Sequence, residues 1–147
     1  MIATIARVLI ALATMGFHFA HAKGAPAFTD DRWNPAHVDK LSPVLRARLQ
    51  SAASVCGPLE AGHFIATFIQ AERAEYAMLH FENLRCAKRE LICRDGRCLH
   101  EVYKIVDGQS RRVLQTYVRE LRLNRVGDNV VVESECESAV CHPVRLP

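Results

Sequence analysis

Several common catalytic motifs are missing from this sequence of 147 residues. It has no Cys-x-x-Cys pair, no Gly-x-Ser-x-Gly segment and no glycine-rich phosphate-binding loop. The first absence argues against a thioredoxin-like redox site and against covalent haem attachment. The other two argue against the serine nucleophile of an α/β-hydrolase and against nucleotide binding through a phosphate loop.

Long apolar runs are also missing, apart from a short one near the N-terminus. The run Val8–Phe17 follows the basic Arg7 and precedes the small-x-small pattern Ala20-His21-Ala22. These are the three parts of a secretory signal peptide, and the run is shorter than the roughly 20 residues that a transmembrane helix needs. We therefore predict a signal peptide over residues 1–22, cleaved after Ala22. The alternative is an uncleaved membrane anchor.

A strong excess of charge of one sign is lacking as well. The formal net charge is +3, from 19 basic and 16 acidic side chains, which is too small to indicate a nucleic-acid-binding protein. Most of the basic excess lies in residues 85–125, almost all of it as arginine, a side chain that binds carboxylates and phosphates in a bidentate way. The competing interpretation is that these arginines only keep an exposed sheet soluble. The candidate anion-binding residues are Arg85, Arg89, Arg94, Arg97, Arg111, Arg112, Arg119 and Arg122.

What the chain does contain is six cysteines, all of them after the predicted cleavage site. An even number in a small exported domain predicts a disulfide framework. Sequence alone allows every pairing, but spacing and turn signals favour three pairs, of which the first closes the longest loop and should stabilise the fold most. The expected pairs are Cys56–Cys86, Cys93–Cys98 and Cys136–Cys141.

A zinc site and a thiol-dependent enzyme are the rival interpretations of these cysteines. The enzyme would use Cys93, Cys98 and His100. Export argues against both, because thiols outside the cytosol are usually oxidised. We therefore expect no catalytic residue, metal or cofactor, and we interpret strand histidines such as His63 and His80 as structural. The rival zinc ligands are Cys93, Cys98, Cys136 and Cys141, with His100 and His142 nearby.

The patterns along the chain predict an α+β fold that begins with one helix. Residues 23–40 are punctuated by Pro, Gly and Asp and are expected to be an irregular lead-in. Residues 41–56 have helical periodicity, with Ser42 as the expected cap and Pro43 in the first turn.

A period-two pattern after the helix predicts about five antiparallel strands, one of them a continuous strand over residues 111–123. Asp95-Gly96 and Asp107-Gly108 are strong signals for tight turns between them. The first strand, near residues 63–70, has apolar side chains on both faces and is expected to be central in the sheet. We therefore expect residues 41–147 to form a single disulfide-stabilised domain in which the helix packs on the sheet.

Two segments carry a resemblance. Trp33-Asn34-Pro35 and Leu99-His100-Glu101-Val102-Tyr103, together with the cysteine spacing, resemble a family of small exported alphaproteobacterial proteins. The resemblance covers most of the mature chain and implies a periplasmic disulfide protein, and it supports no particular catalytic activity. Some broader relatives have an Asp-rich calcium loop, but the equivalent segment here retains only Glu72 and Glu75, so that site is not transferred.

Taken together, the sequence predicts an exported protein of the periplasm that is a non-enzymatic binding or interaction module. Its Arg-rich face would contact an anionic envelope component or an acidic partner protein. Nucleic acid is not an expected partner, and no membrane span is expected after cleavage. A purely structural envelope protein without a ligand site is the remaining alternative.

Overall fold

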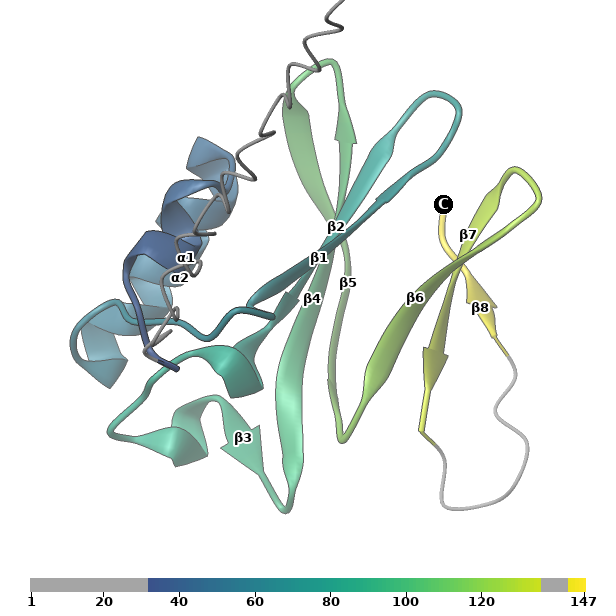
Figure 1. Ribbon diagram of the computed structural model, residues 1–147. Coiled ribbons are helices and arrows are strands. Elements are labelled where there is room, and N and C mark those ends of the chain that lie inside the picture. The colour runs from purple at the N-terminus through teal and green to yellow at the C-terminus, as the bar shows by residue number, and fades with distance from the viewer. Residues whose placement is uncertain (1–31, 136–142) are drawn as a thin grey trace, which may run out of the picture.

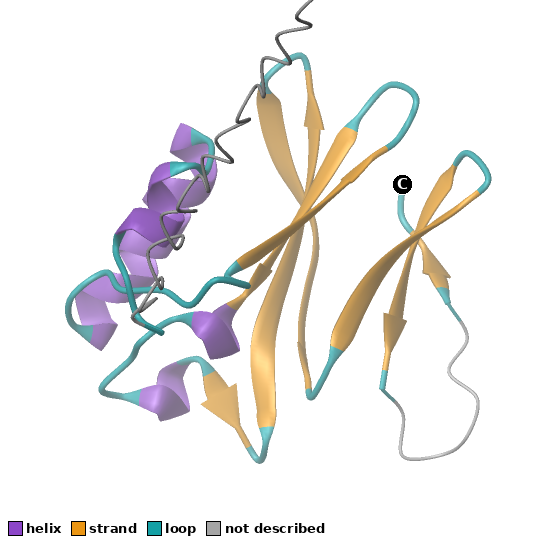
Figure 2. Ribbon diagram, in the orientation of Figure 1, coloured by secondary structure: helices purple, strands orange, loops and turns teal. Residues whose placement is uncertain are grey.

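The computed structural model describes residues 32–135 and 143–147 (Figures 1 and 2). The predicted signal peptide, residues 23–31 of the lead-in, and both Cys136 and Cys141 lie outside the described residues. The helices are α1 (Ala36–Asp39), α2 (Pro43–Cys56), η1 (Phe81–Asn83) and η2 (Arg89–Leu91), the last two being 3₁₀ turns. The strands are β1 (Ala66–Gln70), β2 (Glu75–His80), β3 (Cys93–Arg94), β4 (Arg97–Val106), β5 (Gln109–Val118), β6 (Leu121–Val126), β7 (Asn129–Ser134) and β8 (Val144–Arg145).

Helix α2 is the helix expected from the sequence, and its buried side includes Leu45, Leu49 and Cys56. Pro43 occupies the first turn, where its missing N–H is not needed. The predicted cap is wrong, because the Ser42 side chain makes no capping hydrogen bond and its hydroxyl is buried without a partner among the described residues. The lead-in is also less irregular than predicted, since it contains the short helix α1.

The first sheet has five antiparallel strands centred on β4. Strands β2 and β3 pair with one edge of β4 in succession, and β5 pairs with the other edge. The two predicted turns close two-residue hairpins, Asp95-Gly96 between β3 and β4 and Asp107-Gly108 between β4 and β5. All four turn residues have positive φ, which explains the need for Asp-Gly at these points.

A second sheet corrects the predicted architecture. The sequence suggested one continuous strand through residues 111–123, but the structure ends β5 at Val118 and starts β6 at Leu121. Strand β6 then joins β7 and β8 in a separate three-stranded antiparallel sheet.

The helix and the second sheet cover opposite faces of the five-stranded sheet (Figure 1). On β4, Leu99 and Tyr103 pack with the helix side, whereas Val102 packs with β6 and β7. Strand β2 alternates in the same way, with Leu79 on the helix side and Met78 on the other. These two strands therefore form the wall shared by both hydrophobic cores.

Strand β1 is an edge strand and not the central strand that its apolar pattern suggested. Among the described residues it pairs only with β2. Two of the aromatic side chains behind that prediction are exposed, Phe64 to 76% and Phe68 to 46%. None of the helices in residues 32–135 and 143–147 has the length and apolar character needed to cross a bilayer.

Candidate functional site

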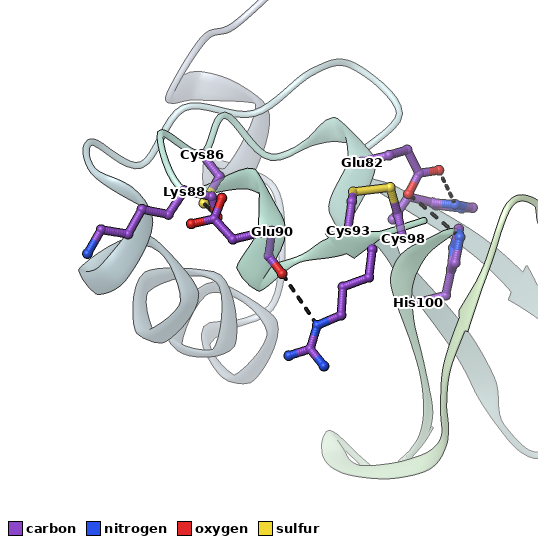
Figure 3. The surroundings of a disulfide bond; sticks show 9 residues. Glu82, Cys86, Lys88, Glu90, Cys93, Cys98 and His100 are labelled. Carbon is purple, nitrogen blue, oxygen red and sulfur yellow. Dashed lines mark hydrogen bonds and ion pairs between the residues drawn. A yellow bond between two sulfur atoms is a disulfide. The ribbon is translucent and has the colours of Figure 1, made fainter. Parts of the chain in front are cut away.

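Two disulfides lie in the described part of the chain. Cys56–Cys86 joins the end of α2 to the loop after η1, and Cys93–Cys98 joins directly opposite residues of β3 and β4 (Figure 3). These are two of the three pairs expected from the sequence. Because Cys93 and Cys98 are bonded to each other, their sulfur atoms are not available as metal ligands or nucleophiles in this state. Such bonds are compatible with an oxidising location outside the cytoplasm.

The β3–β4 hairpin carries a pair of arginines beside its disulfide. Arg94 and Arg97 are directly opposite across the two-residue turn, one step beyond Cys93 and Cys98. Both side chains are exposed, and the Arg94 guanidinium lies 5.7 Å from the ring centroid of Tyr117 on β5. Like charges at directly opposite positions disfavour a hairpin. The disulfide in the adjacent position offsets that repulsion and holds the two arginines together.

Further basic residues lie in the chain segments next to this hairpin. Lys88 and Arg89 lie at the start of η2, which precedes β3, and Arg119 follows Val118, the residue that pairs with Cys98. All three side chains are exposed. We call the residues Lys88, Arg89, Arg94, Arg97 and Arg119 the basic tip.

The other predicted anion-binding arginines lie elsewhere or pair with glutamates. Arg85 pairs with Glu60, and Arg122 pairs with Glu120 at 2.7 Å. Arg111 is opposite Lys104, near the far end of β4 and β5. The Arg-rich stretch of sequence is thus divided by the fold, and only part of it gathers at the basic tip.

Arg112 belongs to a buried network that sequence reasoning missed. Its Nη1 donates a 3.0 Å hydrogen bond to Glu101 on β4, whose side chain is 0% exposed. Arg48 of α2 donates two further bonds of 2.9 Å to the same carboxylate, and the Tyr103 hydroxyl donates one of 2.7 Å. The Arg48 guanidinium also lies 5.0 Å from the ring centroid of Phe81. The network ties α2 to the sheet and satisfies a buried charge.

The pKa values in this network follow from its contacts. Burial alone raises the pKa of Glu101, but hydrogen bonds from Arg48 and Tyr103, with the charges of Arg48 and Arg112, outweigh it and lower that pKa. Burial, followed by the hydrogen bond to Glu101 and its charge, raises the pKa of Tyr103 to about 12. At neutral pH the carboxylate is therefore ionised and the phenol protonated. This arrangement is structural and offers no free group for chemistry.

A second polar group lies on the opposite face of the sheet, where β2 ends. His80 of β2 and His100 of β4 are directly opposite, with ring centroids 5.2 Å apart in an edge-to-face arrangement. Glu82, on η1, lies beside both rings (Figure 3): Oε1 is 3.4 Å from Nδ1 of His80 and Oε2 is 3.7 Å from Nε2 of His100. Thr67 Oγ1 on β1 is 2.9 Å from Nε2 of His80. We call His80, Glu82 and His100 the His–Glu cluster.

The His–Glu cluster adjoins a cavity of about 410 Å³ between the two sheets. Its lining includes His80 and Glu82, with Thr67 and Asn83 from the first sheet side and residues 121–124 of β6. Burial is the main influence that lowers the pKa of His100, with His80 adding to it against the opposing charge of Glu82. Burial raises the pKa of Glu82, but its interactions with His80 and His100 outweigh burial and lower it.

Sequence reasoning identified His80 and His100 separately but did not bring them together. Their proximity depends on the register of β2 against β4, in which His80 pairs with His100. Glu82 had no signal beyond its position two residues after His80. Strands β2 and β4 are not joined by a tight turn, so no local turn signal fixes their register.

Comparison of the chain with protein-family models, with curated proteins and with solved structures finds no match.

Proposed function

We propose that this chain is an exported, non-enzymatic binding protein of the bacterial periplasm, and that its basic tip contacts an anionic partner. The observation that carries the proposal is the direct opposition of Arg94 and Arg97 beside a disulfide. A sheet that needed arginine only for solubility would not require two arginines at directly opposite positions of a hairpin. Held together, they suit partners with closely spaced carboxylate or phosphate groups.

The composition around the hairpin supports the same proposal. The segments that contain the five basic residues of the basic tip include three acidic residues, Glu90, Asp95 and Glu120, and Glu120 pairs with Arg122. Arg94 donates to the backbone carbonyl of Glu90 at 3.4 Å and not to its carboxylate. The predicted signal peptide and the disulfides favour a location in the periplasm. The lipids and polymers of a bacterial envelope include anionic groups, which a basic surface can bind.

The test compares two double variants with the same loss of charge. Arg94→Gln/Arg97→Gln removes the opposed pair. Arg73→Gln/Arg111→Gln removes two exposed arginines near the other end of the sheet. Seven or eight residues of β4 separate the two ends, which is roughly 25 Å and more than two Debye lengths at physiological salt.

The probe is the mature, oxidised protein with vesicles containing phosphatidylglycerol, compared with neutral vesicles and with a heparin matrix. Each arginine near an anionic surface contributes about 1 kcal/mol, so the Arg94/Arg97 variant should bind roughly 30-fold more weakly. The Arg73/Arg111 variant should bind nearly as well as the unmodified protein. Equal losses in both variants, or binding that does not weaken with salt, would contradict the proposal.

A further inference from the structure

The polar atoms of the His–Glu cluster have few good hydrogen-bond partners within the protein. Its distances of 3.4 and 3.7 Å between carboxylate oxygens and ring nitrogens exceed those of ordinary hydrogen bonds. His100 is 0% exposed, and neither of its ring nitrogens makes a hydrogen bond of ordinary geometry among the described residues, although the backbone of Val118 is close enough to raise its pKa. The buried Oε2 of Glu82 also lacks a hydrogen-bond partner among these residues. Three of the five such buried atoms in the described residues therefore belong to this one cluster. Buried polar atoms are rarely left in this state without a reason.

The same distances suit a shared metal ion. Zinc bonds to imidazole nitrogen and carboxylate oxygen are about 2.0–2.2 Å long, so tetrahedral geometry places neighbouring ligand atoms about 3.3–3.6 Å apart. The carboxylate lies 3.4 and 3.7 Å from the two ring nitrogens, and one ligand atom from each residue fits within 4.8 Å of the others. Thr67 contacts the nitrogen of His80 that points away from Glu82, which is how a supporting residue orients a metal-binding histidine.

We propose that His80, Glu82 and His100 bind a divalent transition-metal ion of the Zn²⁺ type. Two imidazoles and one carboxylate disfavour calcium and magnesium, which select oxygen ligands. These three side chains can still bind a metal ion in an oxidising compartment, whereas Cys93 and Cys98 cannot, because they are bonded to each other. This differs from the zinc site considered from the sequence, because His100 is its only common residue.

The ion would keep a coordination position that faces the cavity. His80 and Glu82 line that cavity together with Asn83 and residues 121–124, so water or a small donor ligand can reach the ion from there. Three protein ligands with one open position is the arrangement of zinc sites that bind exogenous ligands, whereas purely structural zinc sites have four protein ligands. The site is independent of the basic tip and does not require an anionic partner.

The experiment titrates chelator-treated, oxidised protein with Zn²⁺ by calorimetry and with Co²⁺ by visible absorption. We expect one equivalent to bind and Co²⁺ to give the absorption of a four-coordinate ion. Glu82→Gln keeps the size of the side chain but removes the charge, and it should weaken Zn²⁺ binding more than tenfold. His80→Asn should have the same effect, and it provides a second test on a residue that is not fully buried.

The matched control addresses adventitious binding at other histidines. His37 and His63 stack with ring centroids 4.4 Å apart outside the cluster, so His37→Asn/His63→Asn removes the other close histidine pair of the described residues. This variant should bind Zn²⁺ and Co²⁺ like the unmodified protein. The proposal would be overturned if the unmodified protein bound no stoichiometric ion, or if the control variant lost binding while folded Glu82→Gln retained it. Either result would leave the Arg94/Arg97 experiment unaffected.

Discussion

Glu101 is the residue on which the contact between helix and sheet depends most. Its buried carboxylate accepts four hydrogen bonds, three from arginine and one from tyrosine. The resemblance motif includes this residue within Leu99-His100-Glu101-Val102-Tyr103, yet nothing in the local pattern shows that a charge on this strand is buried. The partners Arg48 and Arg112 are 53 and 11 residues away along the chain, so only the folded structure reveals the network.

We predict that Glu101→Gln lowers the free energy of unfolding by about 2–4 kcal/mol, because it leaves two arginines without their buried counter-charge. Urea unfolding at pH 7 provides the measurement. Glu60→Gln is the control, since it removes the exposed ion pair with Arg85 and should cost no more than about 1 kcal/mol. Equal effects of the two substitutions would show that the Glu101 network does not stabilise the fold.

The pH dependence of Tyr103 gives a second prediction at this scale. Its pKa is raised to about 12 in the folded protein, by burial first and then by Glu101, whereas an unfolded tyrosine titrates near 10. A raised pKa stabilises the fold fully below pH 10, and that contribution is lost as pH rises from about 10 to about 12. Ultraviolet titration should show Tyr103 ionising about two pH units above the pKa of an unfolded tyrosine. In Tyr103→Phe the late step should be absent; a late step that persists there would assign it to another tyrosine.

The tight turns could be predicted from the sequence, but the division of the strands between two sheets could not. Asp95-Gly96 and Asp107-Gly108 adopt positive φ through local chemistry, so their sequence is sufficient to identify them. The break at Arg119 and Glu120 contains neither glycine nor proline. It exists because Leu121 and Leu123 pack in the core between the two sheets, which is a tertiary effect. Likewise, the exposure of Phe68 on edge strand β1, and of Phe64 just before that strand, depends on which strands pair.

The candidate sites divide in the same way. The basic tip was partly predictable, because Arg94 and Arg97 flank a turn that is visible in the sequence. The His–Glu cluster was not, because it needs the register that places His80 opposite His100. The interpretation of these two histidines as isolated strand residues treated each one separately and did not consider the pairing of their strands.

The two described disulfides should stabilise the fold unequally. Cys56–Cys86 spans 30 positions and joins α2 to the loop after η1, whereas Cys93–Cys98 spans five. In the loop-entropy model the first contributes about 4 kcal/mol and the second about 2 kcal/mol. Urea unfolding of Cys56→Ser/Cys86→Ser and Cys93→Ser/Cys98→Ser should reproduce that order. A larger loss from the short bridge would mean that the hairpin, and not the tie to α2, limits stability.

At the scale of the whole molecule, the five-stranded sheet is the middle one of three layers, with helix α2 on one face and the three-stranded sheet on the other. Strands β2 and β4 contribute Leu79 and Leu99 to the helix side, and Met78 and Val102 to the side of the second sheet. The buried Glu101 network lies on the first side, and the His–Glu cluster with its cavity lies on the second. The basic tip and the His–Glu cluster lie near the same end of the sheet, because Arg97 is three residues from His100 on β4 and Arg119 precedes Glu120, which lines the cavity.

The four cysteines that the structure describes all form disulfides, as expected of the export that we propose. The most direct test is the non-reducing mass of the protein isolated from the periplasm, measured before and after treatment with a thiol-alkylating reagent. The account predicts a chain that begins after Ala22 and gains no alkyl group at any cysteine. A chain that retains residues 1–22, or alkylation at Cys56, Cys86, Cys93 or Cys98 under native conditions, would contradict it.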